Sequence, residues 1–407
     1  MTPVGIFWTL LLAWSVACAV VVLVYRRTLA GIWREPVFRH PVLAIDSDDW
    51  GAGPLAQAPA LRHIADVLVR HRDRSGRTPV FNLALVLAIP DGAAIGRCGA
   101  YVRRALDDPT LQPVLNAVRE GRERGVFSLQ LHGLEHYWPP TLMASPEPAV
   151  KSWLMQAEPQ ATEGLPSHLQ SRWVDATALP TRPLDRAAVR DAANEEVAAF
   201  LQICGVAPQV VVPPTFVWTR DVEQAWEALG IECVVTPGWR YTRRGDDGLP
   251  GGDEGPFVNG DRAGRLTYLV RTDYFEPRRG RGAAHALQVL ADASAAGRPC
   301  LLENHRDNFI GDEDARQHSL SELDALVREA LARHRGLCFL STAEICRIVR
   351  QRDALWLVTS MTRRLPVLWT RVRSQRRLCQ LLSMLALALI GMVMWVVLGL
   401  STLPPHR

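Results

Sequence analysis

The sequence PVLAIDSDDWG, residues 41–51, joins a short apolar run to a dense group of acidic residues. We predict that Pro41–Asp46 is a buried β-strand, because the run is short, apolar and followed by polar residues. Three carboxylates then occupy four positions, at Asp46, Asp48 and Asp49. Carboxylates this close repel one another unless a cation or hydrogen-bond donors hold them, so the strand end predicts a metal site or a carboxyl group of raised pKa. A solvated acidic turn whose aspartates cap a helix is the alternative interpretation.

Apolar strands and helix-like stretches alternate from Pro41 to Arg350, which is typical of repeated β-α units in one domain. The predicted strands are Pro41–Asp46, Val80–Leu87, Phe127–Leu131, Gln209–Val212, Glu232–Thr236, Leu266–Arg271, Cys300–Glu303 and Cys338–Leu340. The predicted helices are Ala56–Arg70, Leu111–Gly121, Arg186–Ile203, Arg220–Leu229, Ala283–Ala296 and Leu320–Arg335. Strands that read as continuous apolar runs are buried on both faces, so the pattern predicts a closed or nearly closed α/β barrel.

Two further polar clusters directly follow predicted strands, where barrel enzymes assemble their active sites. In the segment His132–His136, two histidines separated by three residues can point to one side, as a divalent ion such as zinc requires. In the segment Glu303–Phe309, His305 is suited to give a proton near neutral pH. A structural histidine pair and a capping, salt-bridging loop are the respective alternatives.

Two stretches interrupt the β-α pattern. Tyr137–Pro183 is rich in Pro and carries Trp138, Trp153 and Trp173. A long insertion of this kind often covers a site, and its aromatic faces can stack on sugar rings. Hydrophobic plugs under a loop are the alternative interpretation of these tryptophans. Tyr241–Arg265 is rich in Gly and Asp and is predicted to be a mobile loop without chemistry.

In order and spacing, these motifs resemble those of the polysaccharide deacetylase family, also called the NodB homology or carbohydrate esterase family 4 group, and in particular a divergent, membrane-anchored bacterial branch. The resemblance implies a distorted β/α barrel. It also implies that Asp48 is the catalytic base and that Asp49, His132 and His136 hold a metal ion. By the same resemblance, His305 protonates the leaving group.

The sequence departs from the family pattern at two places. Gly133 stands where the family has Ser or Thr, and the segment Val212–Trp218 lacks the arginine that precedes the family's proline motif. That arginine orients the catalytic aspartate in the family, and Arg271 or Arg306 is the candidate to replace it. Asp46 is an additional candidate catalytic residue.

The resemblance also implies a reaction and a set of substrate contacts. The reaction is metal-dependent removal of an acyl group, N-acetyl, N-formyl or O-acetyl, from a sugar of a cell-surface glycan or of its lipid-linked precursor. The expected metal is Zn²⁺, with Co²⁺, Mn²⁺ or Ni²⁺ as alternatives. Trp239 is expected to line the acyl pocket, and the other candidate substrate contacts are Trp50, Pro214, Trp218 and Asp273.

Two uncharged segments, Gly5–Val24 and Leu381–Leu400, are long enough to cross a hydrocarbon core of about 30 Å. Arginines follow the first and precede the second, so the positive-inside rule predicts a bacterial inner-membrane protein whose catalytic domain is cytoplasmic. A cleaved signal peptide, or lipid attachment at Cys18, is the alternative for the first segment. The expected division is a transmembrane helix at 5–25, a basic linker at 26–40, the barrel at 41–350, a basic amphipathic interfacial segment at 351–378 and a transmembrane helix at 379–402.

Charge and cysteine content limit the partners. A formal net charge of +4 is too small to indicate nucleic acid, and eight scattered cysteines without a Cys-x-x-Cys pair indicate a reduced, intracellular domain. The positive-inside count adds the inner membrane and a lipid-linked or nucleotide-linked sugar as the expected partners. A domain on the outer side would instead act on a polymeric glycan such as peptidoglycan. The sequence does not identify protein partners.

Two other functions fit part of the pattern. His132-x-x-Glu135-His136 also spells a metallopeptidase motif in which the Glu is the base. That motif lies on a helix, whereas Gly133 and the nearby Pro139 argue against a continuous helix here. The second alternative is an inactive barrel that binds a glycan or scaffolds membrane partners, which the missing arginine favours.

Overall fold

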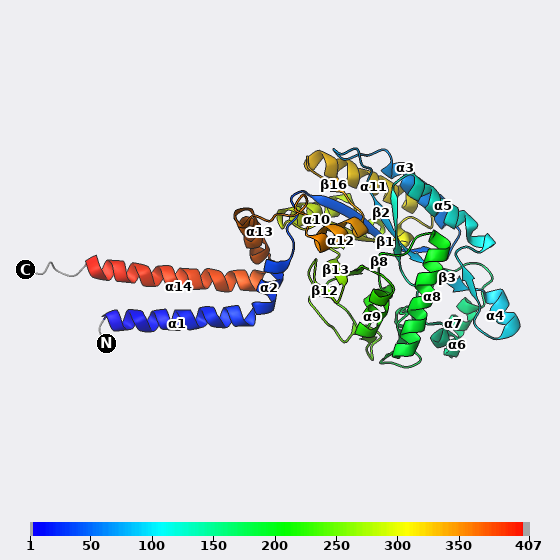
Figure 1. The fold of residues 1–407 in the computed structure, drawn as a ribbon, viewed down its shortest axis with the longest axis horizontal. Helices are drawn as coiled ribbons and strands as arrows, with labels where there is room; N and C mark the ends of the chain where they lie inside the picture. The colour runs from blue at the N-terminus through cyan, green and yellow to red at the C-terminus, as the bar shows by residue number, and fades with distance from the viewer. Residues whose placement is uncertain (1–2, 402–407) are drawn as a thin grey trace, which may run out of the picture. The chain divides into compact units, whose positions relative to one another are not determined.

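The computed structural model describes residues 3–401, so residue 402, the last of the predicted second span, lies outside the described residues. The chain divides into two compact units. Phe38–Leu357 forms the larger unit, and the two ends of the chain together form the other. The larger unit consists of a β-sheet with helices packed along it (Figure 1).

One sheet of ten strands organises the larger unit, in the order β12-β13-β9-β8-β5-β2-β1-β15-β14 with β16 beside the start of β1. Its strand pairs are parallel except for β12 with β13. Because β12 and β14 end the order, the sheet is an unclosed, distorted barrel, which confirms the predicted fold class. Its strands are β1 (Val42–Gly51), β2 (Phe81–Val86), β5 (Phe127–Leu131), β8 (Val210–Val211), β9 (Cys233–Thr236), β12 (Arg262–Ala263), β13 (Leu266–Val270), β14 (Asp273–Tyr274), β15 (Cys300–His305) and β16 (Cys338–Phe339).

Strand β1 carries the acidic cluster through the middle of this sheet. All of its residues are buried, as expected for a strand covered on both faces. It runs parallel to β15, so that Asp48 lies opposite His305. Its pairing with β2 shifts between Ser47 and Trp50, which marks a β-bulge, and Asp49 within the bulge has a positive φ of 71°. The carboxylates therefore lie where the strand is locally bent.

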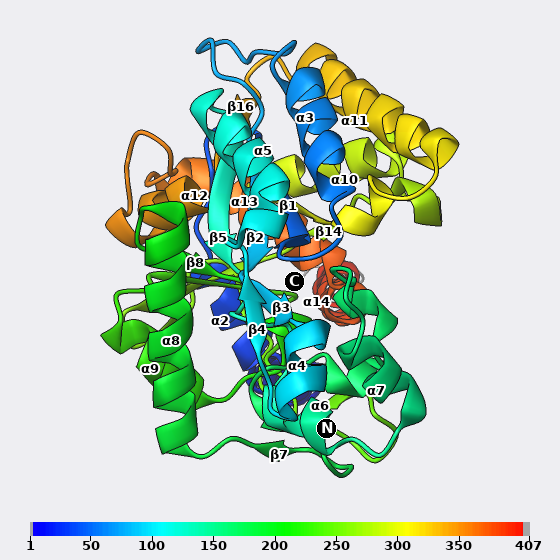
Figure 2. The ribbon, with the colours of Figure 1, turned by 90° about the vertical axis from the view of Figure 1, so that its right-hand side faces the viewer.

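Helices cover the sheet, and the six that the sequence predicts are all present. They are α3 (Gln57–Leu68), α5 (Gln112–Glu123), α8 (Arg186–Cys204), α9 (Arg220–Ala228), α10 (Ala283–Ala295) and α11 (Glu313–Arg333). Helices α10, α11, α3 and α5 pack side by side (Figure 2), and α8 packs on α9. Helix α12 (Thr342–Gln351) was not predicted, although the Ser-x-x-Glu spacing of Ser341 and Glu344 is that of the capping box that begins it.

The insertion that follows β5 folds around a small core of its own. Its elements are α6 (Pro139–Ala144), α7 (Pro148–Leu154), η2 (Thr162–Gly164), η3 (Ser167–Leu169), β6 (Val174–Asp175) and β7 (Arg182–Pro183). Trp153 and Trp173 are buried, and Trp173 packs edge-on against Trp226. These two tryptophans therefore fill hydrophobic interiors, which was the alternative to sugar stacking, while Trp138 is half-buried.

The remaining short elements complete the loops. Within Tyr241–Arg265, predicted to be a loop, lies the two-stranded hairpin of β10 (Arg243–Arg244) and β11 (Pro250–Gly251). The others are β3 (Ala88–Pro90), α4 (Gly92–Cys98), β4 (Arg103–Ala105), η1 (Pro109–Leu111), η4 (Pro214–Phe216), η5 (Pro277–Arg279) and η6 (Arg306–Asn308). Two of them, η5 and η6, flank the polar cluster described below.

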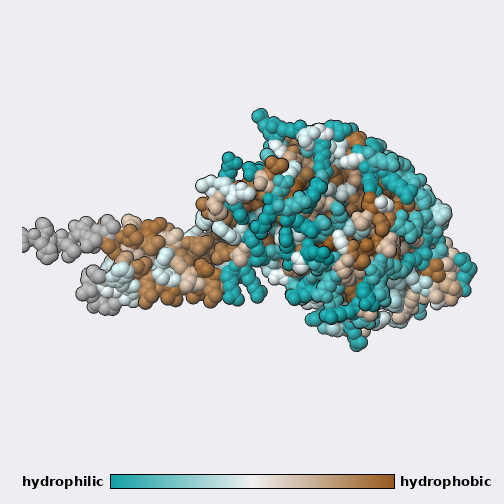
Figure 3. Space-filling view, viewed as in Figure 1, coloured by the Kyte–Doolittle hydropathy of each residue, from teal (hydrophilic) through white to brown (hydrophobic). Residues whose placement is uncertain are grey.

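The second unit contains two long apolar helices, α1 (Pro3–Val24) and α14 (Arg376–Ser401). Gly5–Val24 and Arg376–Val396 are long and apolar enough to cross a membrane, and Figure 3 shows hydrophobic surface along both helices. The indole of Trp14 donates a hydrogen bond of 2.8 Å to the carbonyl of Leu385, which links α1 to α14.

Two shorter helices of this unit, α2 (Arg26–Arg34) and α13 (Met361–Ser374), are strongly basic. Buried Arg371 on α13 donates to the backbone carbonyls of Ile32, Glu35 and Pro36, at 3.3, 3.0 and 2.8 Å. The Glu35 carboxylate lies 3.4 Å from the Arg371 guanidinium. The exposed arginines of the unit's described residues are Arg26, Arg27, Arg34, Arg363, Arg373, Arg376 and Arg377.

Candidate functional site

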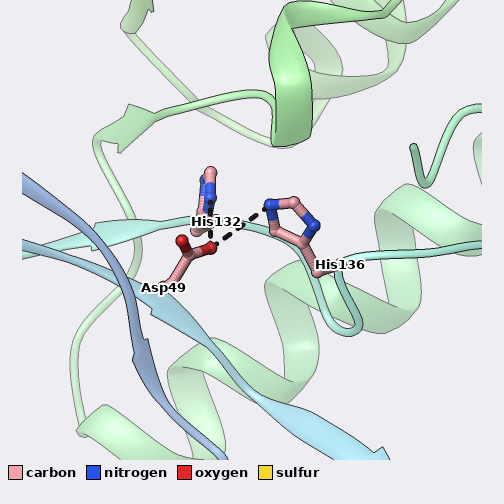
Figure 4. A group of neighbouring side chains, drawn as sticks. All are labelled: Asp49, His132 and His136. Atoms are coloured by element: carbon pink, nitrogen blue, oxygen red, sulfur yellow. Dashed lines mark ion pairs between the residues drawn. The ribbon is translucent and has the colours of Figure 1, made fainter. Parts of the chain in front are cut away.

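Three buried side chains from two strands of the sheet, separated by β2, converge on one point. Asp49 comes from the β1 bulge, and His132 and His136 come from the loop after β5. The Asp49 Oδ1 atom lies 3.4 Å from His132 Nε2 and 3.3 Å from His136 Nε2 (Figure 4). Their ligand atoms all lie within 4.8 Å of one another. The structure thus brings together the three residues predicted to bind a metal.

A sharp turn between the two histidines aims both rings at Asp49. Gly133 has a φ of 95°, and a Cβ there would lie 2.7 Å from the Glu135 carbonyl oxygen, so a side chain is excluded at this position. The Nδ1 atom of His132 lies 2.7 Å from the Val212 carbonyl oxygen. Since a carbonyl only accepts, Nδ1 carries the proton and Nε2 is the atom presented to the cluster.

The donor set fits a divalent ion. Asp49 Oδ1 is buried and has no hydrogen-bond partner among the described residues, as expected for an atom reserved for a cation. Burial lowers the pKa of His136 to about 4, so its imidazole is neutral and able to ligate at neutral pH. Burial raises the pKa of the Asp49 carboxyl, but His136 and His132 outweigh this effect and hold that pKa well below its usual range. Two imidazole nitrogens and one carboxylate oxygen form a common catalytic zinc set with open positions.

Asp48 lies beside this set and is held by an arginine. Arg271, which follows β13, donates from Nη1 to Asp48 Oδ2 and from Nη2 to Oδ1, both at 2.7 Å, and both side chains are buried. Burial raises the pKa of the Asp48 carboxyl, but the Arg271 guanidinium outweighs burial and the net pKa is lowered. Asp48 is therefore an oriented carboxylate at neutral pH. Of the two candidates for the missing arginine, Arg271 contacts Asp48, whereas Arg306 pairs with Glu163.

Asp46 lies on the same face of β1 as Asp48, two residues before it. Its Oδ1 accepts hydrogen bonds from the Thr342 hydroxyl at 2.6 Å and from Gln130 at 3.3 Å, and its Oδ2 is 3.7 Å from Arg271 Nε. Burial raises its pKa. These contacts make Asp46 a support behind Arg271.

His305 ends β15 and faces the same cluster with a carboxylate partner behind it. Its Nδ1 lies 2.6 Å from Oε1 of buried Glu276. Burial lowers the pKa of His305, but Glu276, with Asp49 and Asp48, raises it to about 10. His305 is therefore an imidazolium at neutral pH, and its Nε2 is free of the Glu276 bond.

Two carboxylates of the site were missed by sequence reasoning. Glu276 lies after β14, and Glu303 Oε1 is 3.7 Å from His305 Nε2 while its Oε2 is 3.4 Å from Arg271 Nη1. Burial raises the pKa of Glu303. Glu303 begins a polar segment recognised in the sequence, but no local spacing singles out either residue.

The candidate substrate contacts are only partly accessible. Trp50 and Trp218 are fully buried, their indole N–H groups donating to Ser47 and to Glu223 at 2.8 Å each, and Pro214 is also buried. These three side chains offer almost no exposed surface in this structure, and their role as substrate contacts stays a prediction. Trp239 and Asp273 are half-exposed, with 38% of Trp239 and 36% of the Asp273 side chain accessible.

Glu135 is the residue that would act as base in a metallopeptidase, and the structure does not place it for that role. It is fully buried, its Oε1 accepting from Arg103 Nε at 2.7 Å and its Oε2 from Arg172 Nη1 at 2.6 Å. The segment His132–His136 is a turn and not a helix. A cavity of about 300 Å³ beside this Glu–Arg network shares no residue with the cluster around Asp49; it is lined by Tyr101, Arg103, Trp138, Pro139, Pro140, Met143, Arg172 and Glu195.

No protein-family model and no curated protein matches the sequence. Among solved structures, the chain is similar to a polysaccharide deacetylase candidate from Mycobacterium smegmatis, with 12% identity over 78% of this chain and 94% of that one and a TM-score of 0.40. It is also similar to a 4-alpha-glucanotransferase from Thermococcus litoralis (10%, 76% and 40%, TM-score 0.39) and to the Bc1960 peptidoglycan N-acetylglucosamine deacetylase (10%, 76% and 90%, TM-score 0.37).

Proposed function

We propose that the protein is a membrane-anchored, metal-dependent hydrolase that removes an acyl group from a sugar. The observation that carries the proposal is the arrangement at the ends of β1, β5 and β15. A donor set for a divalent ion, an ionised carboxylate and a protonated imidazole lie together in one buried cluster. Metal-assisted hydrolysis of an amide or ester uses these three functions, which are an electrophile that polarises the carbonyl, a base for water and an acid for the leaving group.

Each residue has a role that follows from its contacts. A divalent ion held by Asp49, His132 and His136 would polarise the acyl carbonyl and make hydroxide available near neutral pH. Asp48 accepts the proton of the attacking water, because Arg271 keeps it ionised and fixes its orientation.

His305 completes the reaction by donating its proton to the departing amine or alkoxide. Glu276 holds its Nδ1–H and stabilises the imidazolium until that transfer. The C–N or C–O bond breaks, the acyl group leaves as a carboxylic acid, and the sugar leaves with a free amine or hydroxyl group.

The second unit supports a proposal for the location of the enzyme and for its substrate. Helices α1 and α14 are proposed to cross the bacterial inner membrane, with the arginines of α2 and α13 on the cytoplasmic side. The catalytic unit then acts in the cytoplasm on a lipid-linked or nucleotide-linked precursor of a cell-surface glycan. Zn²⁺ is the proposed metal, because a site of two imidazoles and one carboxylate suits it.

The test is the release of acid from a panel of lipid-linked and soluble acylated sugars by the purified full-length protein supplied with Zn²⁺. We expect acetate or formate from at least one sugar, and none from Asp48→Asn. The matched control is Asp191→Asn, at an exposed position on α8, which should retain full activity. Equal turnover by Asp48→Asn and the native protein would refute the assignment of the base. Bound metal without acid release from any sugar would favour the glycan-binding alternative.

A further inference from the structure

Arg306 is a buried charge next to the proposed acid. It begins η6 directly after His305, and only 1% of the residue is exposed. An ionised guanidinium removed from water needs a compensating anion. The role of Arg306 can therefore be inferred from the anion that pairs with it and from the segment that supplies this anion.

The anion that compensates Arg306 comes from the insertion and not from the barrel. Glu163, in η2, accepts from Arg306 Nε at 3.0 Å and from Nη2 at 2.6 Å, one oxygen for each nitrogen. This two-point geometry is the one by which Arg binds carboxylates and phosphates in general. The Glu163 side chain remains 34% exposed, whereas that of Arg306 is 1% exposed. The carboxylate thus reaches a buried cation from a solvent-facing segment.

The third guanidinium nitrogen lies against the chain just beyond the strand that carries the catalytic aspartates. Nη1 of Arg306 is buried and has no hydrogen-bond partner among the described residues. A Cβ at Gly53, two residues beyond the end of β1, would lie 2.6 Å from this nitrogen. The absence of a side chain at Gly53 therefore lets the guanidinium pack against this segment while the N–H groups of Nη1 remain without a partner.

We propose that Arg306 binds an oxyanion of the substrate, a carboxylate or a phosphate, and that Glu163 occupies this position until the substrate displaces it. The inference rests on the proposed function only in taking the anion to be carried by an acylated sugar. Displacement leaves the Arg306 fork intact and returns the Glu163 carboxylate to solvent, which its exposure allows. A neutral sugar has no group to exchange for Glu163, so the pair would select anionic substrates.

The test measures anion binding without turnover. Full-length protein in detergent micelles is stripped of metal with a chelator, so that an added anion cannot bind to a metal ion. The affinities for inorganic phosphate and for glucuronate are then measured by calorimetry, with neutral N-acetylglucosamine as the reference. We expect Glu163→Gln to bind phosphate, glucuronate or both about tenfold more tightly than the native protein, because the internal competitor is gone. Glu158→Gln, at an exposed position of the same insertion, is the matched control and should bind as the native protein does.

The double variant Glu163→Gln/Arg306→Lys keeps a positive charge but loses the fork, so it should lose the gain in affinity. Unchanged affinity of Glu163→Gln for both anions would overturn the inference and leave the pair as a tether of the insertion. A gain that persists in the double variant would overturn it as well. A gain for one anion only supports it and identifies the oxyanion as carboxylate or phosphate. The binding experiment does not measure hydrolysis. If the acid-release assay refuted the proposed function, the anion-binding result would therefore still stand. If anion binding failed, the acid-release result would likewise stand.

Discussion

Replacing Glu276 by Gln should shift the alkaline limit of activity, because this carboxylate holds His305 in its protonated form. The substitution keeps the size of the side chain and removes the negative charge 2.6 Å from His305 Nδ1. Burial lowers the pKa of His305, but Glu276 and the site aspartates raise it from 6.5 to about 10. That difference corresponds to about 5 kcal/mol in favour of the imidazolium. One close opposite charge accounts for about 1–3 pH units, and we expect the pKa of His305 to fall by that amount in Glu276→Gln.

The raised pKa of His305 also makes the stability of the protein depend on pH. The pKa of His305 is higher in the folded protein than in the unfolded chain, so its contribution to the free energy of unfolding is complete below about pH 6.5. This contribution, at most about 5 kcal/mol, is lost as the pH rises towards about 10. Glu276→Gln should flatten this alkaline loss of stability.

The assay is the pH dependence of kcat between about pH 6 and 11, measured for the native protein and Glu276→Gln on the same acylated sugar. The alkaline limb reports deprotonation of the acid in the enzyme–substrate complex, so it should move to lower pH in the variant. Asp191→Asn, on α8, serves as the control and should leave the limb in place. Coincident alkaline limbs for the native protein and Glu276→Gln would refute the assignment of His305 as an acid sustained by Glu276.

Three further outcomes are expected. His132→Ala should abolish both Zn²⁺ binding, measured by metal analysis, and acid release. His305→Ala should retain the metal but release acid more slowly. Full activity of metal-free His132→Ala would contradict the scheme. Arg271→Met should reduce the free energy of unfolding by about 3–5 kcal/mol in urea titrations, because it leaves the buried Asp48 carboxylate unpaired. It should also move the acid limb of the pH dependence of kcat to higher pH. An unchanged unfolding midpoint would contradict this prediction. An alkaline phosphatase fused after Arg350 should be inactive in cells, and an active fusion would reverse the proposed topology.

The strands could be predicted from the sequence because the sheet hides both of their faces. Val42–Ile45 and Phe81–Val86 are buried throughout. Every position is apolar except Asn82, whose amide is hydrogen-bonded to backbone groups of Ile45 and Thr342, so the runs stand out from their surroundings. For the tryptophans, residue type is a weaker guide. Trp50 and Trp218 have the residue type expected at a sugar-binding surface, but each indole finds a hydrogen-bond partner inside the core. Residue type alone cannot distinguish these two environments.

The metal ligands could be anticipated because each motif is local, whereas their partners come from other strands. The pair His132 and His136 is visible as a spacing. Arg271 and Glu276 reach Asp48 and His305 only because the carboxyl ends of parallel strands meet at one edge of the sheet. The sequence separations of these contacts are 223 and 29 residues, so no pattern within one segment could select them.

The pairing of base and metal ligand depends on a distortion that the sequence does not reveal. In a regular strand, adjacent side chains point to opposite faces, so Asp48 and Asp49 could not both enter one site. The register shift between Ser47 and Trp50 and the positive φ of Asp49 remove this conflict by turning Asp49 to the histidines while Asp48 stays on Arg271. A positive φ is costly for a residue with a side chain, and backbone strain of this kind persists where the surrounding structure enforces it, often at active sites. The bend in β1 is therefore what turns two consecutive carboxylates into a ligand and a base.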